Sequence, residues 1–117
     1  MKQYNFPDIL KGDTFKARDV VIKNETTQTP INLTDCEIRC EFRKNTKVGT
    51  VVEVLIVGAG ITLSNPTNGT FTIDNFDVNW NADVYYYDFQ FTFSNDVIQT
   101  YFGGYMKVIQ DVTQNPL

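Results

Sequence analysis

Residues 83–93 read DVYYYDFQFTF, and this stretch decides the fold class. Aromatic residues occupy every second position, and the positions between them are mostly polar. Because successive side chains of a β-strand point to opposite faces of the sheet, this period of two predicts a strand with one buried, aromatic face. The buried set is Tyr85, Tyr87, Phe89, Phe91 and Phe93, and the outer set is Val84, Tyr86, Asp88, Gln90 and Thr92.

Residues 36–43 show the same alternation, with apolar positions separated by charged ones. The apolar set is Cys36, Ile38, Cys40 and Phe42, and the charged set is Glu37, Arg39, Glu41 and Arg43. Aspartate is disfavoured inside strands, so Asp88 needs a reason for its place in the outer set. If the two strands are neighbours, we expect Asp88 to pair with Arg39 or Arg43.

The rest of the chain continues as short strands separated by turn-forming clusters. Further strands are expected at 14–23, 51–57, 61–63, 69–73, 97–102 and 105–110, with a short edge piece at 31–33. Turn clusters rich in Asn, Gly and Ser lie at 45–47, 58–60, 64–69 and 94–96. Such spacing favours an all-β fold, namely an antiparallel, immunoglobulin-like β-sandwich of seven to nine strands. We expect one domain over 1–117, with short flexible ends at 1–5 and 114–117.

Composition limits the possible partners. The chain has 117 residues, a net charge of −4 and ten cationic residues that are scattered rather than clustered. Nucleic acids and anionic membranes both bind concentrated positive charge, so neither is expected as a partner. No apolar run approaches the ~18 residues of a bilayer span, and residues 1–8 show no secretory pattern.

The two cysteines are expected to be reduced and buried. On one strand, Cys36 and Cys40 would lie ~13 Å apart, whereas a disulfide needs Cα atoms within ~7 Å. Free thiols fit synthesis in a reducing cytoplasm. The sequence has no histidine that could complete a metal site with them.

No catalytic residues, metal ligands or cofactor site are expected, and the chain is predicted not to be an enzyme. The absence of histidine removes the commonest general base. The acids Asp74, Asp77 and Asp83 do not have the spacing of a calcium loop. The glycines at 58 and 60 lack the remainder of a phosphate-binding motif, so a turn is the better interpretation.

Aromatic residues outside the buried ladder are the candidates for ligand or interface contacts. Tyr86, Trp80 and Tyr101 are the candidates on the outer face and in loops, although Trp80 would also serve to plug one end of the fold. A carbohydrate-binding module that stacks sugars on Trp80 and Tyr86 is the alternative function. At the N-terminus, Tyr4 and Phe6 indicate either an arm that reaches a neighbouring subunit or a first strand of the domain itself.

A series of short motifs resembles a group of small phage and prophage β-sandwich proteins. The motifs are GDTF at 12–15, LTDCEI at 33–38, FRK at 42–44, PTNGTF at 66–71, YYYDFQ at 85–90, TYFGG at 100–104 and VIQDVT at 108–113. In this order they are similar to the N-terminal domains of phage baseplate upper proteins and to fibre-attachment modules.

The resemblance implies a non-enzymatic structural component of a bacteriophage particle. Such a protein would belong to the tail, baseplate or head fibre, or would decorate the capsid. It would be made in the cytoplasm of the host bacterium, would reside in the virion, and would bind other virion proteins. We expect an adaptor or decoration role, and a homo-oligomer or a subunit that assembles on its particle partner.

Overall fold

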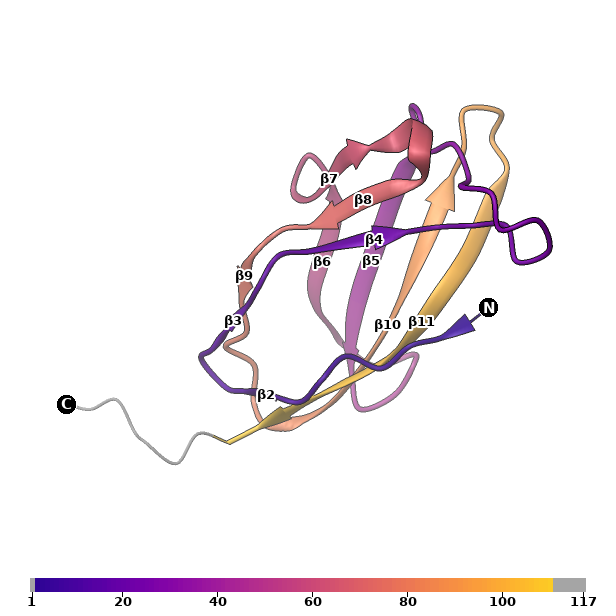
Figure 1. Cartoon of the computed structure of the whole chain (residues 1–117). Helices are drawn as coiled ribbons and strands as arrows, with labels where there is room; N and C mark the ends of the chain where they lie inside the picture. Colours follow the sequence, from indigo (N-terminus) through magenta and orange to yellow (C-terminus); the bar gives the residue numbers. More distant parts are fainter. Residues whose placement is uncertain (1, 111–117) are drawn as a thin grey trace.

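The computed structural model describes residues 2–110, and this part of the chain is built from strands, which confirms the all-β prediction (Figure 1). Among these residues, no helix has the length and apolar character needed to cross a bilayer. The strands are β1 (Lys2–Gln3), β2 (Ile9–Leu10), β3 (Thr14–Phe15), β4 (Arg18–Val21), β5 (Glu37–Lys44), β6 (Val51–Val57), β7 (Gly60–Asn65), β8 (Thr70–Ile73), β9 (Phe76–Asp77), β10 (Asp83–Thr92) and β11 (Ile98–Ile109), with a 3₁₀ turn at Pro66–Asn68.

Nine of the strands form one mixed sheet. Its order is β1-β11-β10-β5-β6-β7-β8-β4, with β2 pairing to β11, while β3 and β9 form a separate two-stranded sheet. Most pairs are antiparallel, as expected, but β1 and β2 run parallel to β11, and β6 pairs in parallel with the start of β7. The last pairing is a tight corner, in which Gly58 and Gly60 both adopt positive φ, a conformation that glycine accepts without steric cost.

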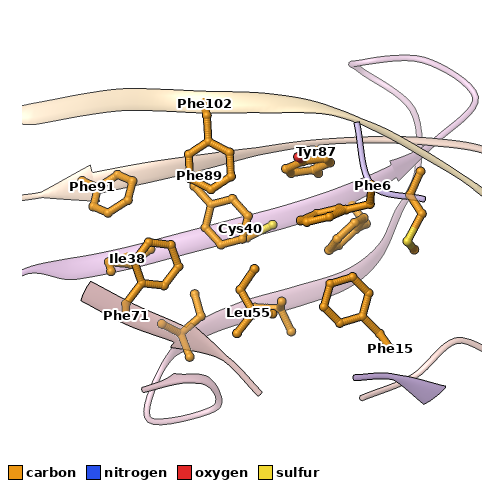
Figure 2. Packing of buried hydrophobic residues seen from close by; sticks show 14 of the residues in the cluster. Phe6, Phe15, Ile38, Cys40, Leu55, Phe71, Tyr87, Phe89, Phe91 and Phe102 are labelled. Carbon is orange, nitrogen blue, oxygen red and sulfur yellow. The ribbon is translucent and has the colours of Figure 1, made fainter. Parts of the chain in front are cut away.

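The sheet curls at this corner, so that β7, β8 and β4 face β5, β10 and β11 across one core (Figure 1). Phe71 of β8 packs against Phe89 and Phe91 of β10, with ring centroids 5.6 and 5.7 Å apart. Figure 2 shows these rings meeting between the two halves of the sheet. The predicted ladder is confirmed, because Tyr85, Tyr87, Phe89 and Phe91 are buried and Phe93 is partly buried against the same core.

Strand β11 is continuous, whereas the sequence indicated two strands separated at the glycines. Gly103 and Gly104 lie inside this strand. Both positions require glycine, because their neighbours leave no room for a side chain. A Cβ at Gly103 would lie 2.6 Å from the Tyr87 carbonyl oxygen, and one at Gly104 would lie 2.2 Å from that of Tyr4. The strand expected at 14–23 is instead divided into β3 and β4.

The N-terminal segment is part of the domain, in agreement with the second of the two interpretations. The amide of Tyr4 donates to the Gly103 carbonyl at 2.9 Å, and that of Phe6 donates to the Tyr105 carbonyl at 3.0 Å. Phe6 is 4% exposed and lies within the core. Residues 2–5, which were expected to form a flexible end, therefore lie along β11, and the end expected at 114–117 falls outside the described residues.

Candidate functional site

A groove separates the two edges of the curled sheet. We call it the edge groove, and its volume is about 1010 Å³. One wall is β4 with the loop that follows it, and the opposite wall is residues 99–102 of β11 with Lys2 and Tyr4 beside them. The buried side chains of Phe6, Ile22 and Phe102 also line the groove, so it reaches down to the core.

Strand β4 presents an unpaired backbone edge to this groove. The strand has β8 as its only neighbour among the residues that the structure describes. The amide of Ile22, directly after β4, donates to the Gly69 carbonyl at 2.8 Å. Because the backbone groups of alternate residues in an antiparallel ladder point to opposite sides, those of Asp19 and Val21 point away from β8. Their N–H and C=O groups are thus available to a further strand.

The first part of β11 has a free edge as well. Pairing with β1 begins at Phe102, which lies opposite Lys2, and continues at Gly103. Residues 98–100 pair with β10 on one side, Tyr101 lies at a shift of that register, and residues 98–101 have no strand on the other side within the 2–110 range. The edge groove therefore lies between two strand edges, each of which could accept an added strand.

Arg18 connects the two walls at one end of the groove. It belongs to β4, and its Nη1 donates to the Tyr4 hydroxyl at 3.1 Å. Its guanidinium carbon lies 5.1 Å from the centre of the Phe6 ring and 5.4 Å from that of Phe15. Such cation–π geometry stabilises the position of the charge over the aromatic faces. The N-terminal segment is thereby held to the opposite edge of the sheet.

A second hollow, the outer pocket, lies on the solvent face of β5, β10 and β11 and has a volume of about 650 Å³. Tyr86 and Tyr105 lie directly opposite each other in the β10–β11 register, with ring centroids 6.1 Å apart. Gly103 lies opposite Asp88 and leaves a position without a side chain beside this pair. Gln3 and Lys47 complete the rim.

Asp88 has different neighbours from those predicted. Strands β5 and β10 are indeed adjacent, but the register places Asp88 directly opposite Glu41. Both arginines bind Glu41 instead, with Nη2 of Arg39 2.8 Å from Oε2 and Nη2 of Arg43 2.6 Å from Oε1. The hydrogen bond from Arg39 is the main cause that lowers the pKa of Glu41, and Arg43 adds to it. The side chain of Asp88 makes no hydrogen bond or ion pair to any residue that the structure describes, so the predicted arginine partner is wrong.

The other predicted aromatic candidates are mostly engaged with the core. Trp80 packs between Phe42 and Tyr85, at centroid distances of 5.2 and 4.8 Å, and is partly buried against the core. Tyr101 lines the edge groove but packs edge-on against Phe91 at 5.1 Å. Of the candidates, Tyr4, Phe6 and Tyr101 meet at the edge groove, and Tyr86 alone lines the outer pocket.

Four further residues of these two surfaces were not singled out from the sequence as site residues. They are Arg18, Glu41, Gly103 and Tyr105. Their importance depends on strand register. Alternation in the sequence predicts which face of a strand a residue occupies, but it does not predict which residue lies opposite on the next strand. The one available signal was the pair of glycines at 103 and 104, between the two strands expected at 97–102 and 105–110, since glycine inside a strand marks close approach of another segment.

The cysteines are free and buried, in agreement with the prediction. Burial raises the pKa of both thiols, most strongly that of Cys40, which has no exposed surface. A raised pKa disfavours the thiolate, which is the form that reacts and binds metals. Within residues 2–110, no three His, Cys, Asp or Glu side chains come together in a way that would hold a metal ion.

Comparison with known proteins adds no family, since neither a family model nor a curated protein sequence matches this chain.

Proposed function

We propose that this chain is a non-enzymatic structural subunit of a bacteriophage particle that binds other virion proteins by strand addition at the edge groove. The observation that carries the proposal is the pair of free strand edges, β4 and residues 98–101 of β11, on opposite sides of one groove. Backbone groups on such an edge recognise any extended chain, and the adjacent side chains select among them.

The resemblance of the motif series to phage modules supports the particle as the setting. On this proposal the curled sheet is a variant of the immunoglobulin-like antiparallel sandwich, in which the parallel pairs of β1, β2 and β7 are additions. Two sets of strands that face each other across one core are common to both arrangements. Because a fold alone does not establish a function, the proposal depends mainly on the edge groove.

A photo-crosslinking experiment tests this proposal directly. A benzophenone amino acid is placed at Val21, which lines the edge groove and is 49% exposed, in cells that assemble the phage. The matched control is placed at Val48, which is 88% exposed and lies outside the groove. We expect an adduct with a virion protein, or with a second copy, from position 21 and none from position 48. Equal adducts at the two positions, or absence of the chain from purified virions by mass spectrometry, would reject the proposal.

The alternative function is a carbohydrate-binding module that stacks sugars on Trp80 and Tyr86. Only one of these two rings remains a candidate for stacking. Trp80 packs against Phe42, Phe76 and Tyr85 and is partly buried against the core. Tyr86 does lie on the outer face, but its partner there is Tyr105 and not Trp80. Trp80 and Tyr86 therefore do not form the flat aromatic row that sugar stacking on both rings would need, and we do not propose this as the main function.

A further inference from the structure

Three locally unfavourable residue choices meet at the outer pocket. Asp88 is an aspartate in the middle of a long strand, where this residue is disfavoured. It lies directly opposite Glu41, and like charges in such a cross-strand pair are destabilising. On its other side it faces Gly103, a glycine within a strand, which weakens the strand. Native proteins tolerate such choices mainly where function requires them, so the pocket is a candidate binding site.

The charges around the pocket are balanced, which indicates an uncharged ligand. Glu41 and Asp88 supply two carboxylates, and Arg43 and Lys47 supply two cations. Glu41 is held by its two arginines, whereas the carboxylate of Asp88 has no hydrogen-bonding partner among residues 2–110. Its carboxylate is free to accept hydrogen bonds from a ligand, and the amide of Gln3 at the rim can both donate and accept.

Two tyrosine rings supply the apolar part of the site. Tyr86 and Tyr105 form a cross-strand pair with rings inclined at 61°, and Tyr105 is 38% exposed. Gly103 lies opposite Asp88 and lines the same pocket, and it places no side chain between the tyrosine rings and the carboxylate. A ligand can therefore approach the backbone between the rings and the carboxylate.

We propose that the outer pocket binds a neutral saccharide, with one sugar ring against Tyr86 and Tyr105 and hydroxyl groups donating to Asp88. A pyranose combines an apolar C–H face with several hydroxyls, and aromatic faces beside a free carboxylate match both parts. The volume of about 650 Å³ lies within the ~300–1,000 Å³ usual for small-molecule sites.

Other ligand classes fit the pocket less well. The structure brings no third carboxylate, thiol or imidazole to it within residues 2–110, so a metal ion lacks ligands. The cations Arg43 and Lys47 are balanced by Asp88 and Glu41, so the pocket has no net positive charge that would favour an anion. An added peptide strand needs a free edge, and at this position β10 is paired on both sides, with β5 and β11. This inference does not depend on the edge groove or on the phage setting.

The test is an NMR titration of the whole chain with millimolar methyl glycosides of glucose, galactose and N-acetylglucosamine, and with maltose, cellobiose and lactose. We expect at least one sugar to give saturable shifts of the backbone amides of Gly103 and Tyr105. Asp88→Ala should weaken that binding by about tenfold or more, since a hydrogen bond to a charged group is lost. Tyr105→Ala should weaken it as well.

The matched control is Gln90→Ala, an outward position two residues along the same strand that does not line the pocket. This variant should bind as the wild type does. Asp88→Ala removes a like-charge pair, so its melting temperature should equal or exceed that of the wild type, which separates lost binding from lost folding. The proposal is overturned if no sugar shifts these amides, if the shifts lie elsewhere, or if Gln90→Ala weakens binding as much as Asp88→Ala.

Discussion

The ring of Phe6, near the N-terminus, stacks on the ring of Tyr87, in the centre of β10, with 4.6 Å between their centroids. Phe6 also meets Phe15 edge-on at 5.1 Å, so it joins the N-terminal segment to the rest of the core. The Tyr87 hydroxyl donates to the Tyr4 carbonyl oxygen, which fixes the same segment from the other side. The start of the chain is thus a structural element of the domain.

Phe6→Ala is expected to destabilise the domain by about 3–5 kcal/mol, because it removes a buried ring and leaves a cavity. Tyr4→Ala is the control on the same segment. Tyr4 is 47% exposed, so this substitution should lower the free energy of unfolding much less. Urea unfolding followed by circular dichroism measures both changes. If Phe6→Ala unfolded at the same urea concentration as the wild type, the segment would not belong to the core.

The aromatic ladder of β10 should be at least as sensitive. Phe89 and Phe91 have no exposed surface, so replacing either with alanine should cost about 3–5 kcal/mol. That is a large share of a typical stability of about 5–15 kcal/mol. Gln90→Ala, between the two on the outer face, should change the melting temperature little. Wild-type melting of either phenylalanine variant would contradict the packing described.

Glu41 should make a small part of the stability dependent on pH. Its pKa lies below the ordinary 4.5, chiefly because of the hydrogen bond from Arg39. A carboxyl with a depressed pKa in the folded state stabilises the protein above its unfolded pKa, and this stabilisation is lost as the pH falls through the folded value. Glu41→Gln loses the two ion pairs but also relieves the repulsion from Asp88, so we expect a net cost of no more than about 1 kcal/mol at pH 7 and almost nothing well below pH 4. Denaturant unfolding at both pH values measures this difference.

The thiols should be present but unreactive in the folded protein. Thiol titration of the unfolded, unreduced chain should find both Cys36 and Cys40 free. In the folded chain at pH 8, alkylation of Cys40 should be slow, since burial raises its pKa well above the ordinary 9.0 and blocks access. Mass spectrometry after timed alkylation, with and without denaturant, checks the contrast. Rapid labelling of Cys40 without denaturant would show that the strand opens easily.

Alternation in the sequence determined the strands β5 and β10 and the face that each buries. A period of two is a local property, because neighbouring side chains on a strand always point to opposite faces. The buried positions of Ile38, Cys40 and Phe42, and the ladder from Tyr85 to Phe91, therefore follow from residue order alone. The burial of both cysteines was predictable for the same reason, whereas the turn at 58–60 was predictable from its two glycines.

Only the tertiary structure decided which residues of different strands meet. Register placed Asp88 opposite Glu41 and not beside an arginine, since a face assignment does not say which residue lies across from it. Strand β11 is continuous where composition suggested a break, and Tyr4 and Asn5 lie so close to Gly104 that a side chain there would clash with them. Contacts between distant segments produce the parallel pairing of β1 and the burial of Phe6. The order of the strands in the sheet leaves the two edges of the groove free. No local pattern in the sequence encodes such long-range arrangements.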